Sequence, residues 1–180
     1  MPANLKKIAQ FFLEKLVPHP KFNSSIPNSD QSLLFPDFLD AVETCVVKYK
    51  KIHADQDVTF TETYRSNTLQ LKYYNDGASK IKSDGMHHFG IAADSIFIIG
   101  GKRTYKGDII RLRKTYGDNG LNILGMWDPL HVQFIPVSDQ SKLRATVKET
   151  LIAFQKANGL PQTGIADSAT IAKAKEKFGN

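Results

Sequence analysis

The chain has 180 residues, a formal net charge of +6 and hydrophobic residues at 41% of its positions. This length suits one domain of ordinary size, or one domain with a small appendage, and the apolar content excludes a globally disordered chain. The basic charge favours anionic surroundings such as nucleic acid, phospholipid head groups or acidic cell-wall polymers, with a merely soluble basic protein as the alternative. Because the sequence has no arginine-rich tract and no aromatic-studded basic motif, we expect no nucleic-acid partner.

Apolar residues at helical spacing predict helices over residues 4–17 and 36–52, separated by a loop rich in Pro, Ser and Asn. Within the first stretch, charged residues interrupt the apolar patch and no cleavage site follows, so we expect an amphipathic helix and no signal peptide. Alternating β-forming residues over 57–64 predict a strand. Residues 67–75 follow as a short helix that stops at Gly77.

The second half of the chain begins with an apolar run over 92–101, which predicts another strand, and a helix is expected over 106–116. A proline turn then leads into a third strand that begins at His131. After residue 138 the sequence shows two helical apolar stripes around a Gly/Pro turn, so we expect one domain over 1–138 and a helical tail over 139–180. The predicted class is α+β, with helices packed on a small antiparallel sheet.

Cys45 is the single cysteine, so an intramolecular disulfide is excluded. Its apolar neighbours at helical spacing predict a buried structural thiol and not a nucleophile. The sequence contains no run of about 18 apolar residues, so we expect no membrane span. We therefore expect synthesis in the cytoplasm, and action outside it only through another system for release or delivery.

Four polar residues carry groups suited to metal chemistry: His87, Asp94, Asp128 and His131. An odd number of positions separates His87 from Asp94, so the two can face one point only if the chain bends, which Gly90 permits. Two imidazoles and one carboxylate form a three-ligand zinc set with an open fourth position, and a second carboxylate can take a proton from water. Helix caps and surface hydrogen bonds explain the same residues, and their spacing leaves both interpretations open.

The sequence contains three blocks in order, TYRSNTLQLKYYNDGASK, HHFGIAAD and WDPLHVQ. They resemble the Y-R-S-x-x-x-Q-x-x-x-Y-x-x-G, H-x-x-G-x-A-x-D and W-[DE]-x-x-H blocks of the M15 family of zinc peptidases. That family includes D-alanyl-D-alanine carboxypeptidases, D,D-dipeptidases and the L-alanyl-D-glutamate endopeptidases of phage endolysins. The resemblance covers about residues 58–133 and implies a Hedgehog/DD-peptidase-like fold, one zinc ion and bacterial peptidoglycan as substrate. The residues that match the first block are Tyr64, Arg65, Ser66, Gln70, Tyr74 and Gly77.

The resemblance also implies roles for individual residues. It implies zinc ligation by His87, Asp94 and His131. Asp128 would be the general base that later passes its proton to the leaving amine. Arg65 would contact the substrate carbonyl or carboxylate and stabilise developing negative charge, for which a structural salt bridge is the alternative.

Three further residues are expected to contact the substrate: Ser66, Gln70 and His88. Gln70 would support the arginine or the substrate. His88 is out of register with the zinc-binding motif, because His87 is the histidine at the right distance from the glycine. We interpret His88 as a pocket wall or a substrate contact, with a partly exposed spacer as the alternative.

One position departs from the family pattern. The family usually has Ser two residues before the first histidine, where this chain has Gly85. A hydrogen bond that orients His87 is therefore either missing or supplied by Ser83. Trp127 is expected either to pack beside the site or to lie in the core.

The stretch TVKETLIAFQKANGLPQTGIADSATIAKA in the tail resembles the second half of a three-helix peptidoglycan-binding domain, with an unrelated helical hairpin as the alternative. The first helix and first loop of such a domain are not evident. We therefore interpret the tail as a trimmed module that packs on the peptidase domain, with independent wall binding as the alternative.

These observations predict a zinc-dependent peptidoglycan hydrolase that cuts the stem peptide. The L-Ala–D-Glu bond is favoured because Asp128 and the tail resemble endolysins, whereas the D,D-dipeptidases have Glu at that position. A D-alanyl-D-alanine carboxypeptidase and a non-catalytic wall-binding protein are the alternatives. We expect a monomer that acts at the cell wall or periplasm, either as a phage lysin or as an antibacterial effector with a secretion or immunity partner.

Overall fold

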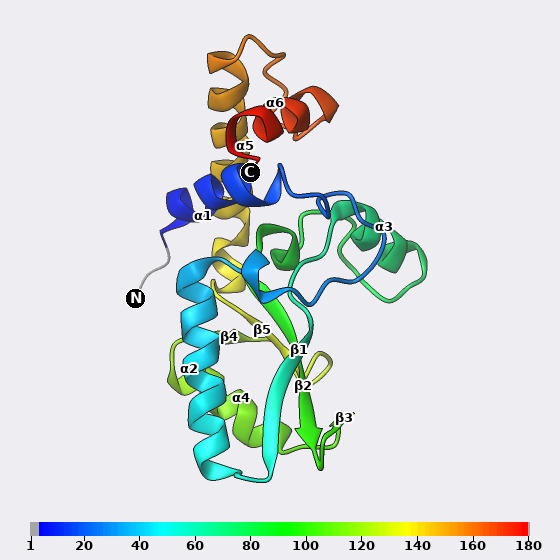
Figure 1. Cartoon of the computed structure of the whole chain (residues 1–180), viewed down its shortest axis with the longest axis vertical. Coiled ribbons are helices and arrows are strands. Elements are labelled where there is room, and N and C mark those ends of the chain that lie inside the picture. Colours follow the sequence, from blue (N-terminus) through cyan, green and yellow to red (C-terminus); the bar gives the residue numbers. More distant parts are fainter. Residues whose placement is uncertain (1–3, 180) are drawn as a thin grey trace.

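A five-stranded antiparallel sheet occupies the lower half of the molecule in the view of Figure 1. The computed structural model describes residues 4–179. The main strand order is β1-β2-β5-β4, and β3 pairs with the far end of β2. The strands are β1 (Gln56–Glu62), β2 (Ala92–Ile99), β3 (Lys102–Thr104), β4 (Asn122–Ile123) and β5 (His131–Gln133).

The helices of the described residues surround this sheet and extend beyond it. The α-helices are α1 (Leu5–Phe11), α2 (Pro36–Ile52), α3 (Asn67–Asn75), α4 (Ile109–Asp118), α5 (Gln140–Ala157) and α6 (Ser168–Phe178). Shorter elements are the π-helix η1 (Phe12–Leu16) and the 3-10 helices η2 (Gln31–Leu33), η3 (Met86–Phe89) and η4 (Val137–Asp139). The predicted α+β class with a helical C-terminal region is confirmed.

One face of the sheet is covered by α2 and α4, which pack against each other. Tyr49 of α2 reaches Phe97 of β2, with ring centroids 5.8 Å apart. The Ser95 hydroxyl, also on this face, is 2.8 Å from the hydroxyl of Tyr116 in α4. The Cys45 thiol is buried in the same layer and burial raises its pKa to about 11, as a structural thiol requires. Side chains on the opposite face of β2 therefore remain free for a site.

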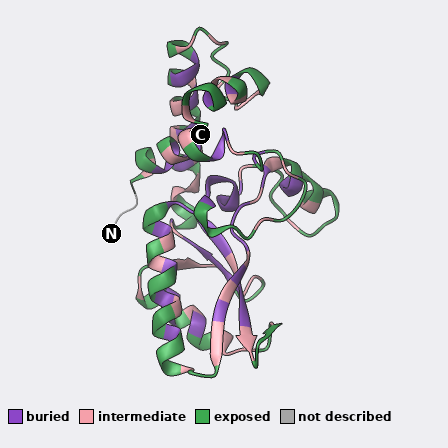
Figure 2. Cartoon of the chain, in the orientation of Figure 1, coloured by how far each residue is buried: buried purple, intermediate pink, exposed green. Residues whose placement is uncertain are grey.

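The C-terminal helices pack on the N-terminal ones. In Figure 1, α5 runs up from the end of the sheet and α1 lies across it. The buried side chains of α5, such as Leu143 and Leu151, belong to the same core cluster as Phe12 and Leu16 of η1. Purple segments continue from the sheet into α5 in Figure 2. The division into domains 1–138 and 139–180 stays a prediction, because no independent observation separates the two parts.

The expected elements agree with the structure except at sheet edges, at one helix start and over residues 12–16, where the helix expected over 4–17 continues as a π-helix. The bounds of α2 and α3 equal the predicted 36–52 and 67–75. The helix expected over 106–116 instead begins at Ile109, because the Asp108 side chain caps it by accepting from the Arg111 amide. Strands β3 and β4 were not predicted, since each is shorter than the alternating pattern needed to recognise a strand.

No helix among residues 4–179 is long and apolar enough to cross a membrane.

Candidate metal centre

Three acidic or imidazole side chains lie in a row across neighbouring strands on the open face of the sheet. Asp94 of β2 pairs with Glu62 of β1 on one side and with His131 of β5 on the other. Residues directly opposite each other in an antiparallel ladder point to the same face. The sheet register therefore brings Asp94 and His131 together from distant parts of the chain.

His87 reaches the same place from η3, the short 3-10 helix that precedes β2. The helix ends at Gly90, which has a φ of 67°. A Cβ built on Gly90 would lie 2.4 Å from the Leu33 carbonyl oxygen, so only glycine fits. The predicted bend between His87 and Asp94 is confirmed, and it directs both side chains to one point.

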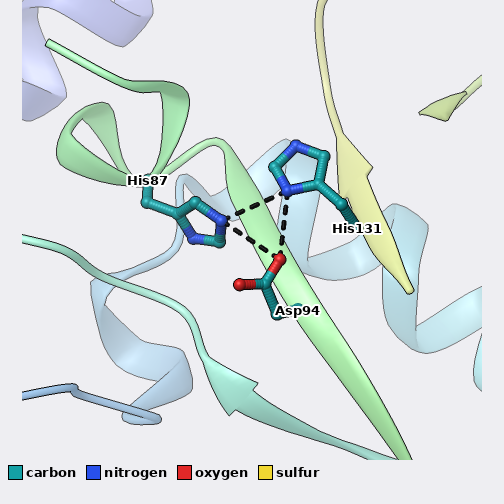
Figure 3. Close-up of side chains that lie close together, drawn as sticks. All are labelled: His87, Asp94 and His131. Atoms are coloured by element: carbon teal, nitrogen blue, oxygen red, sulfur yellow. Dashed lines mark hydrogen bonds and ion pairs between the residues drawn. The ribbon is translucent and has the colours of Figure 1, made fainter. Parts of the chain in front are cut away.

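The three side chains converge on a small space (Figure 3). His87 Nε2 lies 3.3 Å from His131 Nδ1 and 3.3 Å from Asp94 Oδ1. His131 Nδ1 lies 3.0 Å from Asp94 Oδ1. Both histidines are buried, and each offers a single nitrogen to the others. This group is called the metal cluster below.

The geometry of the metal cluster fits zinc. A tetrahedral zinc ion bound at about 2.0–2.2 Å separates its ligand atoms by roughly 3.3–3.6 Å. The observed separations of 3.3, 3.3 and 3.0 Å are therefore close to one face of such a tetrahedron. Two imidazole nitrogens and one carboxylate oxygen also form a donor set typical of catalytic zinc.

Electrostatics favour positive charge inside the metal cluster. Burial alone would raise the pKa of Asp94, but the charge of His87 and hydrogen bonds from both histidines hold it well below its usual value. Burial lowers the pKa of His131, but its hydrogen bond and charge interaction with Asp94 raise it overall. A carboxylate anion thus faces two imidazoles, and either a proton or a metal ion can satisfy it.

Asp128 lies next to the metal cluster but outside it. Its Oδ2 is 3.9 Å from His131 Nδ1, and its side chain is partly exposed. Partial burial raises the pKa of the Asp128 carboxyl, and the nearby Asp94 charge adds to this against the opposing effect of His131. A carboxylate with a raised pKa beside an open ligand position is suited to proton transfer.

Arg65 is held on the other side of Asp94. Its Nη2 lies 3.3 Å from Asp94 Oδ2, the carboxylate oxygen that faces away from His131. Its Nε donates to Glu62 Oε2 at 2.9 Å, and Nη2 also contacts that oxygen. The guanidinium carbon stacks 4.8 Å above the Tyr73 ring. Arg65 therefore forms the buried salt bridge that was the alternative interpretation, and its contact with the substrate stays a prediction.

Gln70 and Ser66 connect the arginine to helix α3. Gln70 Oε1 accepts from Arg65 Nη1 at 3.2 Å, and its amide nitrogen donates to the Ile81 carbonyl at 2.7 Å. Ser66 caps α3 by accepting from the Leu69 amide at 3.0 Å, and its hydroxyl also contacts the Ser24 carbonyl. Both side chains are buried in these hydrogen bonds. Their substrate contacts stay a prediction, whereas their contacts within the protein position Arg65 and the start of α3.

His88 lies in a second group of residues, on the other side of η3. Its ring is 4% exposed and packs against Phe12 and Phe22, with centroids 5.2 and 5.3 Å apart. Its Nδ1 is 3.3 Å from the Arg65 carbonyl oxygen, and Tyr64 lies beside it. The His88 ring also lines a cavity of about 560 Å³ that α5 borders. The alternative of a partly exposed spacer is wrong, and a pocket wall stays a prediction.

The Gly85 departure has a structural consequence. Among the side chains of residues 4–179, none bonds to His87 Nδ1, which is buried. Ser83 instead lies 3.3 Å from Asp84 Oδ2, so it does not replace the missing family serine. A Cβ at Gly85 would approach Gln70 Oε1 to 3.1 Å, a tight contact. Glycine here therefore accommodates the glutamine that supports the arginine.

Two residues near the site were missed in the sequence. Glu62 is buried and its Oε1 has no partner among the described residues. Gln133 is buried two positions after His131 and accepts from it. Strand alternation was the available signal for Gln133, because it puts Gln133 on the face of His131. Alternation misleads for Glu62, because the register shifts between Phe60 and Glu62, so that Phe60 pairs with Ser95 and Glu62 pairs with Asp94 on the other face. A charged or amide side chain on such a face needs a partner.

Trp127 and Tyr74, two aromatic residues of the motif blocks, both have exposed side chains. Trp127 is 76% exposed, so the core interpretation is wrong, and its indole lies against Gly125 just before Asp128. Tyr74, which matches the family tyrosine, is exposed. The neighbouring Tyr73 is the residue that contacts the guanidinium of Arg65.

Comparisons with known proteins add one family match. The PG_binding_1 family, described as a peptidoglycan binding domain, matches residues 119–173. A search of curated proteins found no match. Among solved structures, the L-Ala D-Glu endopeptidase ChiX of Serratia marcescens is similar at 16% identity and a TM-score of 0.46, over 62% of this chain and 92% of that chain. The structural likeness is too distant to assign a function.

Proposed function

We propose that the protein is a zinc-dependent peptidoglycan hydrolase that cuts the stem peptide, most favourably at the L-Ala–D-Glu bond. The observation that carries the proposal is the triangle of His87 Nε2, Asp94 Oδ1 and His131 Nδ1, with edges of 3.3, 3.3 and 3.0 Å. The match of residues 119–173 to a peptidoglycan binding domain supports the choice of substrate.

The chain's own residues divide the catalytic work. When bound, zinc supplies a Lewis acid that lowers the pKa of water and polarises the scissile carbonyl. His87, Asp94 and His131 hold the ion, and Asp128 takes the proton from the attacking water and passes it to the leaving amine. The water oxygen forms the new bond to the carbonyl carbon while the C–N bond breaks, so no other reactant is needed.

Arg65 is the residue we propose to face the developing oxyanion. Its hydrogen bonds to Glu62, Asp94 and Gln70 fix the guanidinium plane before substrate arrives. A donor held in place in this way needs no reorganisation when charge develops in the transition state. Ser66 and Gln70 would act mainly through Arg65, and His88 through the cavity that its ring lines.

The decisive experiment combines metal analysis with digestion of purified peptidoglycan. We expect one zinc ion per chain, and mass spectrometry should show new L-Ala carboxyl and D-Glu amino termini. Release of free D-Ala would favour the carboxypeptidase instead. Binding to the wall without any new termini would favour the non-catalytic alternative.

Asp128→Asn tests the base directly. It should lower the turnover number by about 10²–10⁴-fold with zinc content unchanged, because the amide cannot accept the proton. Asp118→Asn is the matched control, since Asp118 is an exposed carboxylate paired only with Lys114. Full activity of the Asp128 variant would remove the base from the mechanism.

We also propose where the protein acts, from the location of its substrate. A hydrolase of stem peptides must reach the wall or periplasm, which requires a release or delivery system. A secretion or immunity partner would fit an antibacterial effector, and release at lysis would fit a phage lysin. We propose a monomer, because one chain supplies all three ligands and the base.

A further inference from the structure

The first turn of α5 reaches the metal cluster through a chain of amide side chains. His131 Nε2, the nitrogen that faces away from the cluster, lies 3.3 Å from Gln133 Oε1. Gln140 of α5 donates from its amide nitrogen to the same oxygen at 3.3 Å. Arg144, one turn further along α5, donates to Gln140 Oε1 at 3.5 Å. The strand that carries His131 is thus linked to the helical C-terminal region.

The hydrogen bonds at the two ends of this series of amides fix which amide atoms donate and which accept. The Gln133 amide nitrogen donates to the Ile135 carbonyl at 2.6 Å, and a carbonyl can only accept. Gln133 must therefore turn its oxygen toward His131. At the other end, Arg144 can only donate, so Gln140 must turn its oxygen to Arg144 and its nitrogen to Gln133. Neither glutamine can flip without losing a bond.

This polarity selects one tautomer of His131. Because Gln133 Oε1 only accepts, Nε2 of His131 carries a proton, and Nδ1 is the nitrogen that can exchange its proton for a metal ion. Nδ1 is the atom that faces His87 and Asp94. The remote amides therefore prepare the nitrogen that a metal ion needs, and they do so with a buried glutamine that is 1% exposed.

A second contact joins α5 to the other half of the cluster. Arg144 Nε donates to the Asp84 carbonyl at 3.0 Å, just before the segment that leads into η3 and His87. Asp84 is the one non-glycine residue with positive φ among residues 4–179, at 54°. Paired bonds of 2.8 Å with Asn67 hold it there. Arg144 thus fixes both approaches to the site.

We propose that Gln133 and Gln140 are positioning residues through which α5 orients His131, so that the C-terminal helix is a structural part of the metal centre. The inference rests on the proposed function for the identity of the metal. It differs from wall binding, because it gives α5 a role that operates without peptidoglycan. It also predicts that the chain cannot be divided at residue 139 without weakening the metal centre.

The test compares two glutamine-to-methionine variants of the full chain with one glutamine-to-glutamate variant. Gln133→Met should weaken zinc binding by about 10–100-fold in a chelator competition, the usual cost of losing such a support. Gln140→Met should weaken it less, by roughly a few-fold, because Gln133 keeps its bond to Ile135. Gln133→Glu keeps an acceptor facing His131 but loses the donor to the Ile135 carbonyl, so it should recover only part of the affinity.

Gln155→Met is the matched control. Gln155 is another buried glutamine of α5, and it bonds to Thr163, Ile165 and Thr170 in the C-terminal region alone. Its loss should destabilise α5 and α6 while the zinc affinity stays unchanged. A loss of affinity equal to that of Gln133→Met would show that general destabilisation is responsible and would overturn the proposal.

A second readout separates this inference from the proposed function. Nitrogen NMR of the metal-free protein reports which His131 nitrogens carry a proton, and Nε2 should be protonated in the wild type and only partly protonated in Gln133→Met. Wild-type protein that binds no zinc would remove the proposed function and leave this protonation result to decide the positioning role. Unchanged protonation of Nε2 in both the Gln133 and Gln140 variants, with unchanged zinc affinity, would overturn it.

Discussion

Helix η3 separates two regions that each contain one of two adjacent histidines. On one side, His87 belongs to the metal cluster, where two nitrogens and a carboxylate oxygen lie within 3.3 Å of one another. On the other side, His88 belongs to an aromatic cluster that includes Phe12, Phe22 and Phe89. The same side chain, one residue apart, is thus placed in opposite surroundings.

The difference shows that neighbours, not residue type, determine what an imidazole does. Burial among aromatic rings lowers the pKa of His88 to about 4, so it stays neutral and serves as a core residue. His131 of the metal cluster is equally enclosed, but its hydrogen bond and charge interaction with Asp94 outweigh burial and raise its pKa. A carboxylate within 3.0 Å is therefore what converts a buried histidine into a candidate ligand.

Replacing each histidine of the pair is the strongest way to test this comparison. His87→Ala should lose bound zinc and all hydrolysis, because a catalytic zinc site needs three protein ligands and only two would remain. His88→Leu should keep one zinc ion per chain, since its ring contacts the aromatic cluster, Tyr64 and the Arg65 carbonyl. Zinc analysis of both folded proteins checks this. Loss of zinc from folded His88→Leu would mean that the ligand was assigned to the wrong histidine.

Much of the metal cluster was predictable because its residues occur in short motifs with local causes. The bend at Gly90 follows from the odd spacing of His87 and Asp94, and the structure has the positive φ that this bend requires. The bounds of α2 and α3 were predictable for a similar reason, since caps and apolar spacing are local signals. Features that depend on residues close together in the sequence could therefore be predicted without a structure.

Features that depend on strand pairing could not be predicted from the sequence. The row of Glu62, Asp94 and His131 depends on which strands are adjacent, which no single segment encodes. The support of His131 by Gln133 and Gln140 likewise requires α5 to start beside β5. Strands of two or three residues, such as β3 and β4, are recognised only by their pairing with β2 and β5.

Arg65 offers the next largest effect, because it connects the metal cluster to a buried acid. Arg65→Met should lower the turnover number by about 10²–10³-fold, the cost of losing one donor to the oxyanion. It should also destabilise the fold by about 3–5 kcal/mol, since Glu62 is left buried without its partner. Steady-state kinetics and denaturant unfolding measure the two losses separately.

The double variant Arg65→Met with Glu62→Gln separates the two roles of the arginine. Removing the uncompensated charge should restore most of the stability, as replacement of a whole buried pair often does. Turnover should stay low if Arg65 acts on the transition state. Recovery of both stability and turnover would reduce Arg65 to a structural salt bridge, which was the alternative from sequence.

Gly90 tests the turn that places the two histidines on opposite sides of η3. Gly90→Ala should cost about 3 kcal/mol of unfolding free energy, because the new Cβ is strained by the positive φ and collides with the Leu33 carbonyl. Gly77→Ala is the matched control, with a φ of 74° and nothing within 4 Å of a Cβ. It should cost only about 1 kcal/mol. Equal losses in chemical denaturation would show that the close contact at Gly90 is unimportant.

The smallest expected effect is the loss of folding stability at acidic pH that His88 of the aromatic cluster causes. The folded pKa of His88 is about 4, below the ordinary 6.5, because burial outweighs the opposing charge of Asp84 and the hydrogen bond to the Arg65 carbonyl. The unfolded chain therefore binds the proton first, so stability is complete above about pH 6.5 and falls as pH drops toward about 4. Between about pH 7.5 and pH 5 the loss should be about 2 kcal/mol.

His88→Leu removes this titration and so isolates it. In metal-free protein, where acid release of zinc cannot contribute, the variant should lose less stability on acidification than the wild type by about 2 kcal/mol. Urea unfolding at the two pH values measures the difference directly. Stability curves that fall in parallel would mean that His88 takes up its proton in the folded state as readily as in the unfolded chain. The aromatic cluster would then admit water to the His88 ring, and the contrast with the metal cluster would lose its physical basis.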